Sequence, residues 1–255
     1  MPKSNAKTAI QSSFAREPDG TPLAGDALLA KAREVTGDTV LLSFSRGKDS
    51  LAAWLYLRPH FKIIPYHLDW VPGLSFVDDS IKYYEDYFGT HIYRLPHPIF
   101  YEYLIQYMWQ TPEQGVAVMR LNLPDYDLAD VDNLLCVAYA TPTTYTAIGM
   151  RAKDNLERRR LLWQQGSLAE PTKRRRYFYP VWDWGVEQVA AIIKQHGVKL
   201  PPDYQYWGRT IAAFDYQFLK PLAVHFPDDY QRVKEWFPLI DLELFRYERV
   251  GHGNA

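Results

Sequence analysis

Cysteine is almost absent, since Cys136 is the only one in a chain of 255 residues. A single cysteine excludes a disulfide within the chain, a cysteine-rich zinc site, an iron–sulfur cluster held by several cysteines and a catalytic pair of thiols. Cys136 lies in the apolar stretch VDNLLCVAYA, which is typical of a helix. We expect it to be a small buried hydrophobic residue, because free cysteines usually behave that way.

Long apolar runs and an excess of charge of either sign are also missing. No stretch approaches the roughly 20 apolar residues that span a bilayer, and the start of the chain, MPKSNAKTAIQSSFAREPDG, lacks the apolar centre of a signal peptide. Lys and Arg number 29 against 30 Asp and Glu, so the net charge of -1 gives no overall attraction to nucleic acid or membrane. We therefore expect a cytoplasmic protein without a membrane partner, in which any basic surface is local.

Short apolar runs alternate with segments of helical pattern along most of the chain. The expected strands are Thr39 to Phe44, Lys62 to His67, His91 to Leu95 and Thr144 to Ile148. The expected helices are Gly25 to Val35, Asp49 to Leu57, Ser75 to Phe88, Pro98 to Trp109, Ala129 to Tyr139, Val186 to His196, Ile211 to His225 and Asp229 to Trp236. This alternation predicts an α/β fold with a parallel sheet, helices on both of its faces and a binding crevice at one edge.

The stretch VLLSFSRGKDSLAAW (40–54) interrupts this pattern at the first predicted strand-to-helix turn. Backbone N–H groups of the turn and of the first helical turn would point outward together, beside hydroxyls and the Lys48 ammonium, and such a place favours anions. The helix dipole alone contributes only about 0.3 to 1 kcal/mol, so several amides and Lys48 must act together to hold a phosphate chain. Gly47 would allow close backbone approach or a positive φ.

Two common phosphate-binding motifs do not fit this turn. A Walker-type loop needs a glycine where Leu42 stands and a Ser or Thr where Asp49 stands. A dinucleotide fingerprint needs several glycines, and the turn has one. A strand-loop-helix junction that binds nothing is the structural alternative.

Ser45, Gly47, Lys48, Asp49 and Ser50 resemble the Ser-x-Gly-Lys-Asp-Ser signature of the PP-loop ATP pyrophosphatase superfamily. The resemblance implies an adenine nucleotide alpha-hydrolase-like (Rossmann-like) sheet whose first loop holds the pyrophosphate end of ATP. It also implies cleavage between the α and β phosphates, usually with adenylation of a substrate oxygen.

A second segment, YTAIGMRAKDNLERRR (145–160), repeats the pattern of an apolar strand followed by a glycine and charged residues. It resembles the Gly-x-Arg-x-x-Glu-Ser-x-x-Arg segment of the phosphoadenosine phosphosulfate (PAPS) reductase-like branch, with Asp154 in place of Glu and Asn155 in place of Ser. Pro180, Asp183 and Trp184 match a third segment of that branch. Guanidinium groups bind phosphate oxygens bidentately, and a nearby acid can orient them.

The resemblance assigns a role to each residue of the expected site. Lys48, Asp49 and Arg151 are the expected catalytic residues, with Asp49 also on the Mg²⁺ side, directly or through water. The expected nucleotide-binding residues are Ser43, Ser45, Arg46, Gly47, Lys48, Asp49, Ser50, Asp69, Gly149, Arg151, Asp154 and Arg158. Arg46 stands where many relatives have a second glycine, and it would either add charge at the phosphates or narrow the loop. Asp69 would contact the adenosine, although a capping or turn role fits it equally well.

These assignments predict a Mg²⁺-dependent ATP pyrophosphatase that adenylates an unidentified acceptor. Sulfonucleotide reductases use a cysteine near the C-terminus, and the chain has none after Cys136. Two alternatives stay open: a PAPS-binding, reductase-like protein whose partner supplies the thiol, and a nucleotide-binding subunit without catalysis of its own.

The expected organisation is a flexible N-terminal arm (1–24), a nucleotide-binding α/β domain (25–184) and a helical, aromatic-rich extension packed on it (185–255). Aromatic and basic residues in RRRYFYPVWDW and YQYWGRT would either stack bases or pack in the core and a dimer interface. The basic runs 158–160 and 173–176 are either a binding surface or a solvated face. If sulfur is transferred, a partner protein must supply it.

Overall fold

The computed structural model describes residues 14–169, 176–211 and 213–250. Its five strands are β1 (Thr39–Ser43), β2 (Lys62–Asp69), β3 (Tyr93–Pro96), β4 (Thr146–Ile148) and β5 (Tyr177–Phe178). They form one sheet in the order β3-β2-β1-β4-β5, and every neighbouring pair is parallel. This order is that of a doubly wound nucleotide-binding sheet, and it confirms the expected α/β fold.

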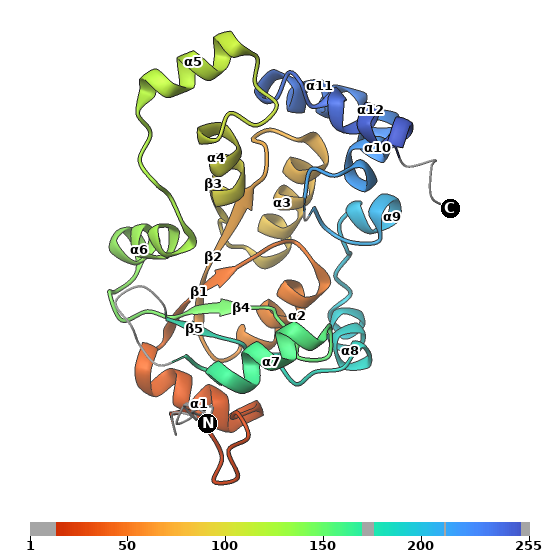
Figure 1. Ribbon diagram of the computed structural model, residues 1–255. Coiled ribbons are helices and arrows are strands. Elements are labelled where there is room, and N and C mark those ends of the chain that lie inside the picture. Colours follow the sequence, from red (N-terminus) through yellow and green to blue (C-terminus); the bar gives the residue numbers. More distant parts are fainter. Residues whose placement is uncertain (1–13, 170–175, 212, 251–255) are drawn as a thin grey trace, which may run out of the picture.

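The helices of the described residues alternate with the strands and then continue alone toward the C-terminus (Figure 1). They are α1 (Gly25–Thr36), α2 (Lys48–Leu57), α3 (Ser75–Phe88), α4 (Pro98–Ile105), α5 (Pro112–Leu121), α6 (Leu128–Tyr139), α7 (Leu156–Gln165), α8 (Val186–His196), α9 (Asp203–Trp207), α10 (Tyr216–His225), α11 (Pro227–Trp236) and α12 (Asp241–Val250). Within the described ranges, no helix has both the length and the apolar character needed to cross a membrane.

Alternate residues of β1 point to opposite faces of the sheet, and each face has its own core. Val40 and Leu42 belong to the larger core, which includes residues of α1, α2 and α3. Leu41 packs on the other face with Val131 and Cys136 of α6. The uninterrupted apolar run of β1 therefore reflects a strand that is covered on both faces.

Cys136 is buried in this smaller core, as expected. Burial raises the pKa of its thiol, and the negative charge of Asp132 adds to the effect. A buried thiol of this kind is chemically inert.

Some elements differ from the expectation at places where the backbone changes direction. The helix that begins at Pro98 ends at Ile105 rather than Trp109, because Tyr107 and Trp109 both have positive φ, at 57° and 52°. Helix α10 begins at Tyr216, where Asp215 caps it by accepting from the Phe218 N–H, rather than at Ile211.

The first described residues of the expected arm (1–24) contact the rest of the fold, and the flexibility of the arm stays a prediction. Arg16 Nη2 donates to the Trp163 carbonyl at 2.7 Å, and Trp182 Nε1 donates to the Leu23 carbonyl at 2.8 Å. Ala15 is buried. Residues 1–13 lie outside the described residues, so the expectation stays a prediction there.

Candidate functional site

The loop between β1 and α2 lies at the edge of the sheet where all five parallel strands end. Gly47 is the N-cap of α2 with φ of -68°, and the positive φ, 64°, belongs to Arg46 instead. Of the two alternatives for Gly47, positive φ is therefore not the one that the structure uses, and close backbone approach to a ligand stays a prediction. A Cβ atom at Gly47 would lie 3.2 Å from Ser45 Oγ and 3.5 Å from Thr210 Oγ1.

The hydroxyls of the loop bond to one another and to the backbone. Ser45 Oγ and Ser50 Oγ lie 3.1 Å apart, and Ser50 Oγ donates to the Gly47 carbonyl at 2.9 Å. Ser50 is buried and Ser45 is exposed. Ser50 therefore holds the loop in shape, and Ser45 is the hydroxyl that a ligand can reach.

Arg46 turns into the protein instead of toward the mouth of the loop. Its Nη1 and Nη2 donate to the two carboxylate oxygens of Asp203 at 2.9 and 2.8 Å, and Nη1 also donates to Ser80 Oγ at 2.8 Å. The side chains of Arg46 and Asp203 are 2% and 0% exposed. The guanidinium is thus used to fix the loop to α3 and α9, which corrects the expectation that it adds charge at the phosphates.

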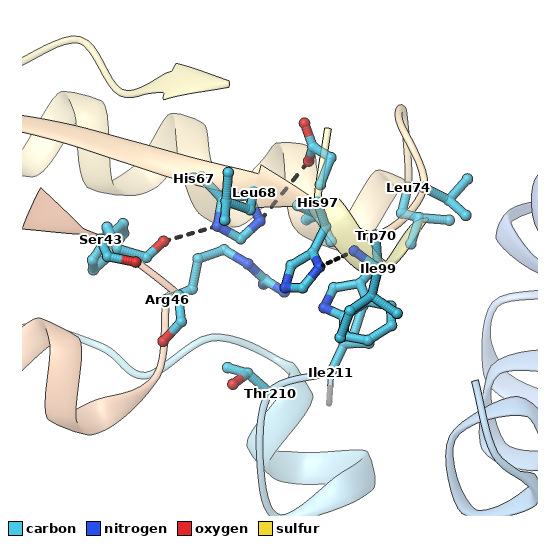
Figure 2. A pocket seen from close by; sticks show the side chains of 15 residues that line it. Ser43, Arg46, His67, Leu68, Trp70, Leu74, His97, Ile99, Thr210 and Ile211 are labelled. Atoms are coloured by element: carbon cyan, nitrogen blue, oxygen red, sulfur yellow. Dashed lines mark hydrogen bonds and ion pairs between the residues drawn. The ribbon is translucent and has the colours of Figure 1, made fainter. Parts of the chain in front are cut away.

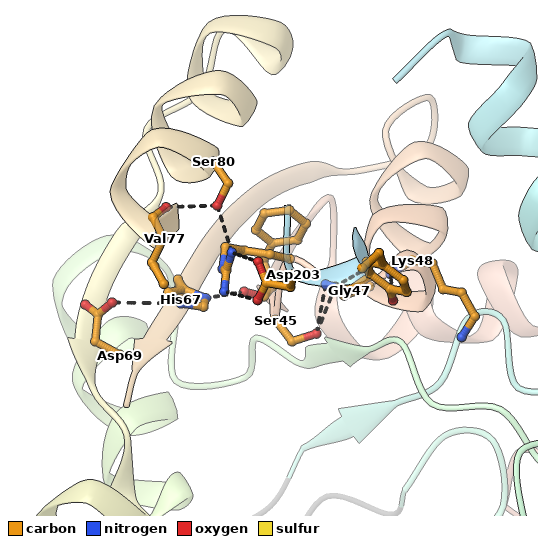
Figure 3. Close-up of polar contacts among 12 residues, drawn as sticks. Ser45, Gly47, Lys48, His67, Asp69, Val77, Ser80 and Asp203 are labelled. Carbon is orange, nitrogen blue, oxygen red and sulfur yellow. Dashed lines mark hydrogen bonds and ion pairs between the residues drawn. The ribbon is translucent and has the colours of Figure 1, made fainter. Parts of the chain in front are cut away.

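Lys48 points the other way, and Figure 3 shows its side chain extended away from Asp203. Its Nζ lies 2.8 Å from Asp49 Oδ2, and Asp49 Oδ1 lies 2.7 Å from Arg151 Nε. Arg151 Nη2 and Arg158 Nη1 each lie 2.6 Å from an oxygen of Asp154. The structure thus joins the two segments that the sequence singled out into one chain of alternating charges.

Arg151 is the least satisfied member of this chain. The residue is 3% exposed, yet its Nη1 and Nε have no hydrogen-bond partner in the part of the chain that the structure describes. Nε is close to Asp49 Oδ1, but its N–H is not aligned with that oxygen. Buried donors without partners are costly, so an anion that accepts from Arg151 would be stabilised here.

Gly149 serves the packing of the two segments. A Cβ atom at this position would lie 2.5 Å from Ser50 N and 2.6 Å from the Asp49 carbonyl oxygen. Both contacts are with backbone, so no side-chain rotation could relieve them. The absence of a side chain at Gly149 is what allows the end of β4 to lie against the first turn of α2.

A cavity of about 300 Å³ opens beside the loop, at the ends of β1 and β2 (Figure 2). Asp69 lines it and is held by Arg94, whose Nε and Nη2 donate to the two carboxylate oxygens at 2.9 and 2.6 Å. Burial raises the pKa of Asp69, and the Arg94 charge opposes that rise. Asp69 therefore faces the cavity as one half of an ion pair, rather than as the cap or turn residue that was the alternative.

Two histidines that the sequence did not single out also line this cavity. His67 Nδ1 lies 2.8 Å from the Phe44 carbonyl, and burial with the nearby Arg46 charge lowers its pKa to about 3. His97 stacks on Trp70 with ring centroids 4.5 Å apart, and burial lowers its pKa to about 4. The cavity is thus lined by neutral imidazoles and a flat indole surface.

The C-terminal segment contributes residues that sequence reasoning missed. Tyr204 accepts a hydrogen bond from the Lys48 N–H at 2.9 Å, so its hydroxyl covers one of the amides expected to bind an anion. Trp207 stacks on Phe226 and donates from Nε1 to the Phe218 carbonyl, so the core alternative holds for this residue. In the sequence, the segment PPDYQYW (201–207) is only a cluster of aromatic residues beside one acid.

The basic runs are only partly described. Arg159 and Arg160 are exposed on α7, whereas residues 173–175 lie outside the described residues. Their two alternative roles stay predictions.

The Asp49 carboxylate does not fit the metal role. Both of its oxygens already lie against cations, Lys48 and Arg151. Across the described ranges, no group of three His, Cys, Asp or Glu side chains could hold a metal ion. Any Mg²⁺ at this loop is therefore treated below as part of the nucleotide substrate.

No protein-family model matches the chain, and no curated protein does. Among solved structures, the chain is similar to the U34-tRNA thiolase NcsA from Methanococcus maripaludis, determined with its [4Fe-4S] cluster. The sequence identity is 16% and the TM-score is 0.44, over 84% of this chain and 77% of that chain.

Proposed function

We propose that this protein is an ATP pyrophosphatase of the PP-loop type, which binds the phosphates of ATP at the loop and the nucleoside in the adjoining 300 Å³ cavity. The observation that carries the proposal is the buried Arg151 guanidinium, with an unpartnered Nη1, at the junction of the loop and the second charged segment. The position of the loop at the carboxyl edge of a parallel sheet supports it, because ligands of open α/β sheets bind there.

The charged side chains beside the loop suit the binding of a polyphosphate. Lys48, Arg151 and Arg158 carry three positive charges, and Asp49 and Asp154 carry two negative ones. The carboxylates hold the cations in place before a ligand arrives, so little side-chain ordering remains to be done on binding. Lys48 and Arg151 would then donate hydrogen bonds to the β and γ phosphates in addition to their bonds to the carboxylates.

The reaction follows from this placement. An acceptor oxygen attacks the α phosphorus, the new O–P bond forms, and the bond from the α phosphorus to the bridging oxygen breaks. The electron pair of that bond leaves with pyrophosphate, and the acceptor carries the adenylyl group. Lys48, Arg151 and the exposed Ser45 hydroxyl would stabilise the charge that develops on pyrophosphate.

The chain itself supplies no thiol for this chemistry, because Cys136 is buried in the smaller core. A sulfur-donor partner, a nucleic-acid acceptor and a homodimer therefore enter only as predictions, as does the cytoplasmic location. The PAPS-binding, reductase-like alternative and the subunit without catalysis are decided by the experiment that follows.

Calorimetric titration with MgATP and, separately, with PAPS tests the nucleotide. We expect tighter binding of MgATP, and Lys48→Ala should weaken it at least tenfold, because charge-assisted hydrogen bonds contribute about 1.5 to 3 kcal/mol. Lys82→Ala is the matched control, since Lys82 is exposed on α3 and pairs only with Asp86.

Three results would count against the proposal. Unchanged affinity in a folded Lys48→Ala variant would remove the phosphate site. Tighter binding of PAPS would favour the reductase-like alternative. Nucleotide binding without pyrophosphate release, in the presence of candidate acceptors and of cell extract that supplies partners, would indicate the subunit without catalysis.

A further inference from the structure

A second and larger cavity, of about 820 Å³, lies beside the first at the same edge of the sheet. The two cavities share Ser43 and Ile99 in their linings, so the second adjoins the place where the α phosphate of a nucleotide would lie. Residues of α4, of the segment before α6, of α6 and of α7 form its walls. Its size is that of a small-molecule site.

The charged residues that line this cavity all have one sign. They are Glu102, Asp125, Asp127 and Asp130, and none of the described lining residues is a Lys, Arg or His. The loop next to it presents Lys48, Arg151 and Arg158. The electrostatic contrast disfavours a second polyanion in this cavity and favours a cation.

Tyrosine rings form much of the remaining surface. The rings of Tyr101 and Tyr126 lie 5.3 Å apart at 63°, and their hydroxyls donate to the carbonyls of Pro124 and Pro96. Because both hydroxyls are anchored to backbone, the rings stand in fixed orientations with their hydroxyl ends occupied. Fixed aromatic rings at an angle to each other are typical of sites that bind organic ammonium groups.

The negative charges of Asp125 and Asp130 act on these two tyrosines. Burial and the Asp125 charge raise the pKa of Tyr101, and burial and the Asp130 charge raise that of Tyr126 to about 12. Asp127 and Asp130 cap the start of α6, where they accept from backbone N–H groups, and within the described residues no three acidic, histidine or cysteine side chains could hold a metal ion together. The lining therefore suits an extended organic cation better than a metal ion.

We propose that the 820 Å³ cavity binds an organic amine, with its ammonium group among the carboxylates and its body against the rings of Tyr101 and Tyr126. That an oxygen atom on the body of this amine accepts the adenylyl group rests on the function proposed above, whereas the binding of the amine does not. The shared wall at Ser43 would bring such a ligand next to the phosphates.

Calorimetry with a matched pair of probes tests the proposal on the full chain. Tyramine and 4-hydroxyphenylacetate have the same ring and differ in the sign of the charge. We expect tyramine to bind at millimolar concentration or below and 4-hydroxyphenylacetate not to bind. The double variant Glu102→Gln, Asp125→Asn should weaken tyramine binding at least fivefold, and Asp86→Asn, which alters an exposed carboxylate on α3, should leave it unchanged.

A pair of substitutions at Tyr101 distinguishes the effect of losing the aromatic ring from the effect of disturbing the fold. Tyr101→Leu removes the aromatic face and should weaken tyramine binding severalfold, whereas Tyr101→Phe keeps the ring and should stay close to wild type. Circular dichroism of each variant checks that it is folded. Equal affinity for both probes, preference for the anion, or no heat from tyramine at millimolar concentration would overturn the proposal.

The same titrations distinguish this inference from the proposed function. Lys48→Ala should leave tyramine affinity unchanged, because Lys48 does not line this cavity. If wild type binds tyramine but not MgATP, the proposed function fails and the amine site stands. If it binds MgATP but not tyramine, the amine site fails and the nucleotide site stands.

Discussion

Two buried arginines lie on opposite sides of the same loop, and their surroundings differ. On the inner side, Arg46 makes three aligned hydrogen bonds, two to Asp203 and one to Ser80, and leaves only Nε without a partner among the described residues. On the outer side, Arg151 makes one aligned hydrogen bond, to Asp154, and leaves Nη1 without a partner among the described residues. Both residues are at most 3% exposed.

The difference separates a structural role from a binding role. A buried charge whose hydrogen bonds point at protein groups has been stabilised by the fold itself, and no ligand is needed to explain it. Among the described residues, Arg151 leaves both Nε and Nη1 unused, so more of the desolvation cost of this charge remains until something binds. Four predictions test this contrast, beginning with the inner side.

The largest effect is expected for Asp203→Ala, which leaves the Arg46 guanidinium buried without its carboxylate. Breaking a buried ion pair from one side costs about 3 to 5 kcal/mol, so urea denaturation should show a loss of this size in the free energy of unfolding. Asp228→Ala, an exposed acid on α11, should change it by less than about 0.5 kcal/mol.

A double variant tests whether the loss of stability comes from the buried, uncompensated Arg46 charge. The pair Arg46→Met, Asp203→Leu removes both charges and should recover much of the stability, because well-packed apolar replacements of buried pairs are often neutral. A loss below about 1 kcal/mol for Asp203→Ala alone would mean that the inner pair does not hold the loop.

The inner and outer sides also differ in how far the sequence could predict them. Ser45 to Ser50 and Arg151 to Arg158 were predicted as one site because each segment follows a strand, and the parallel sheet brings the ends of its strands to one edge. The partner of Arg46 could not be predicted in the same way. Asp203 is 157 residues away in a five-residue helix, which is too short to show a period of its own.

The close approach of two backbone segments could not be predicted from the sequence either. Gly149 was predicted as a nucleotide contact. Only the structure shows that it packs on Ser50 and Asp49, because a Cβ atom at Gly149 would lie 2.5 Å from Ser50 N and 2.6 Å from the Asp49 carbonyl oxygen. Strand β5 has two residues, too few for an alternating pattern to show. The four expected strands, in contrast, carried short runs rich in apolar residues, and all of them are present.

The second prediction concerns the stability of the fold at acid pH, and it rests on two buried histidines near the inner side. His67 has a folded-state pKa of about 3 and His97 of about 4, against an ordinary value of 6.5. The unfolded chain therefore binds protons between these values and pH 6.5 that the folded chain does not. Stability should be lost as pH falls below about 6.5, by up to about 1.4 kcal/mol per pH unit for each histidine.

Urea denaturation in steps from pH 7 to pH 5 measures this slope. His67→Gln should reduce the slope by the contribution of one titrating histidine. Equal slopes in wild type and in His67→Gln would show that His67 is not buried in its neutral form.

On the outer side, Arg151→Met should affect nucleotide binding more than stability. Asp49 keeps Lys48 and Asp154 keeps Arg158 when Arg151 is removed, so neither carboxylate is left without a cation. Loss of charge-assisted hydrogen bonds to phosphate should weaken MgATP binding by roughly 10- to 100-fold. Arg158→Met, at a side chain 46% exposed, should have a smaller effect. A large loss of stability with unchanged affinity would make Arg151 a structural residue like Arg46.

The smallest effect is expected at Tyr204, which connects the two sides. Its hydroxyl accepts from the Lys48 N–H, an amide at the start of α2 where a phosphate oxygen would also bind. A nucleotide that uses this amide must first displace the hydroxyl, so Tyr204→Phe should tighten MgATP binding by roughly two- to tenfold, the equivalent of one neutral hydrogen bond. Tyr206→Phe, in the same short helix, is the control and should leave the affinity unchanged. Weaker binding in Tyr204→Phe would instead mean that the hydroxyl contacts the nucleotide, and that α9 forms part of the binding site rather than a cover over it.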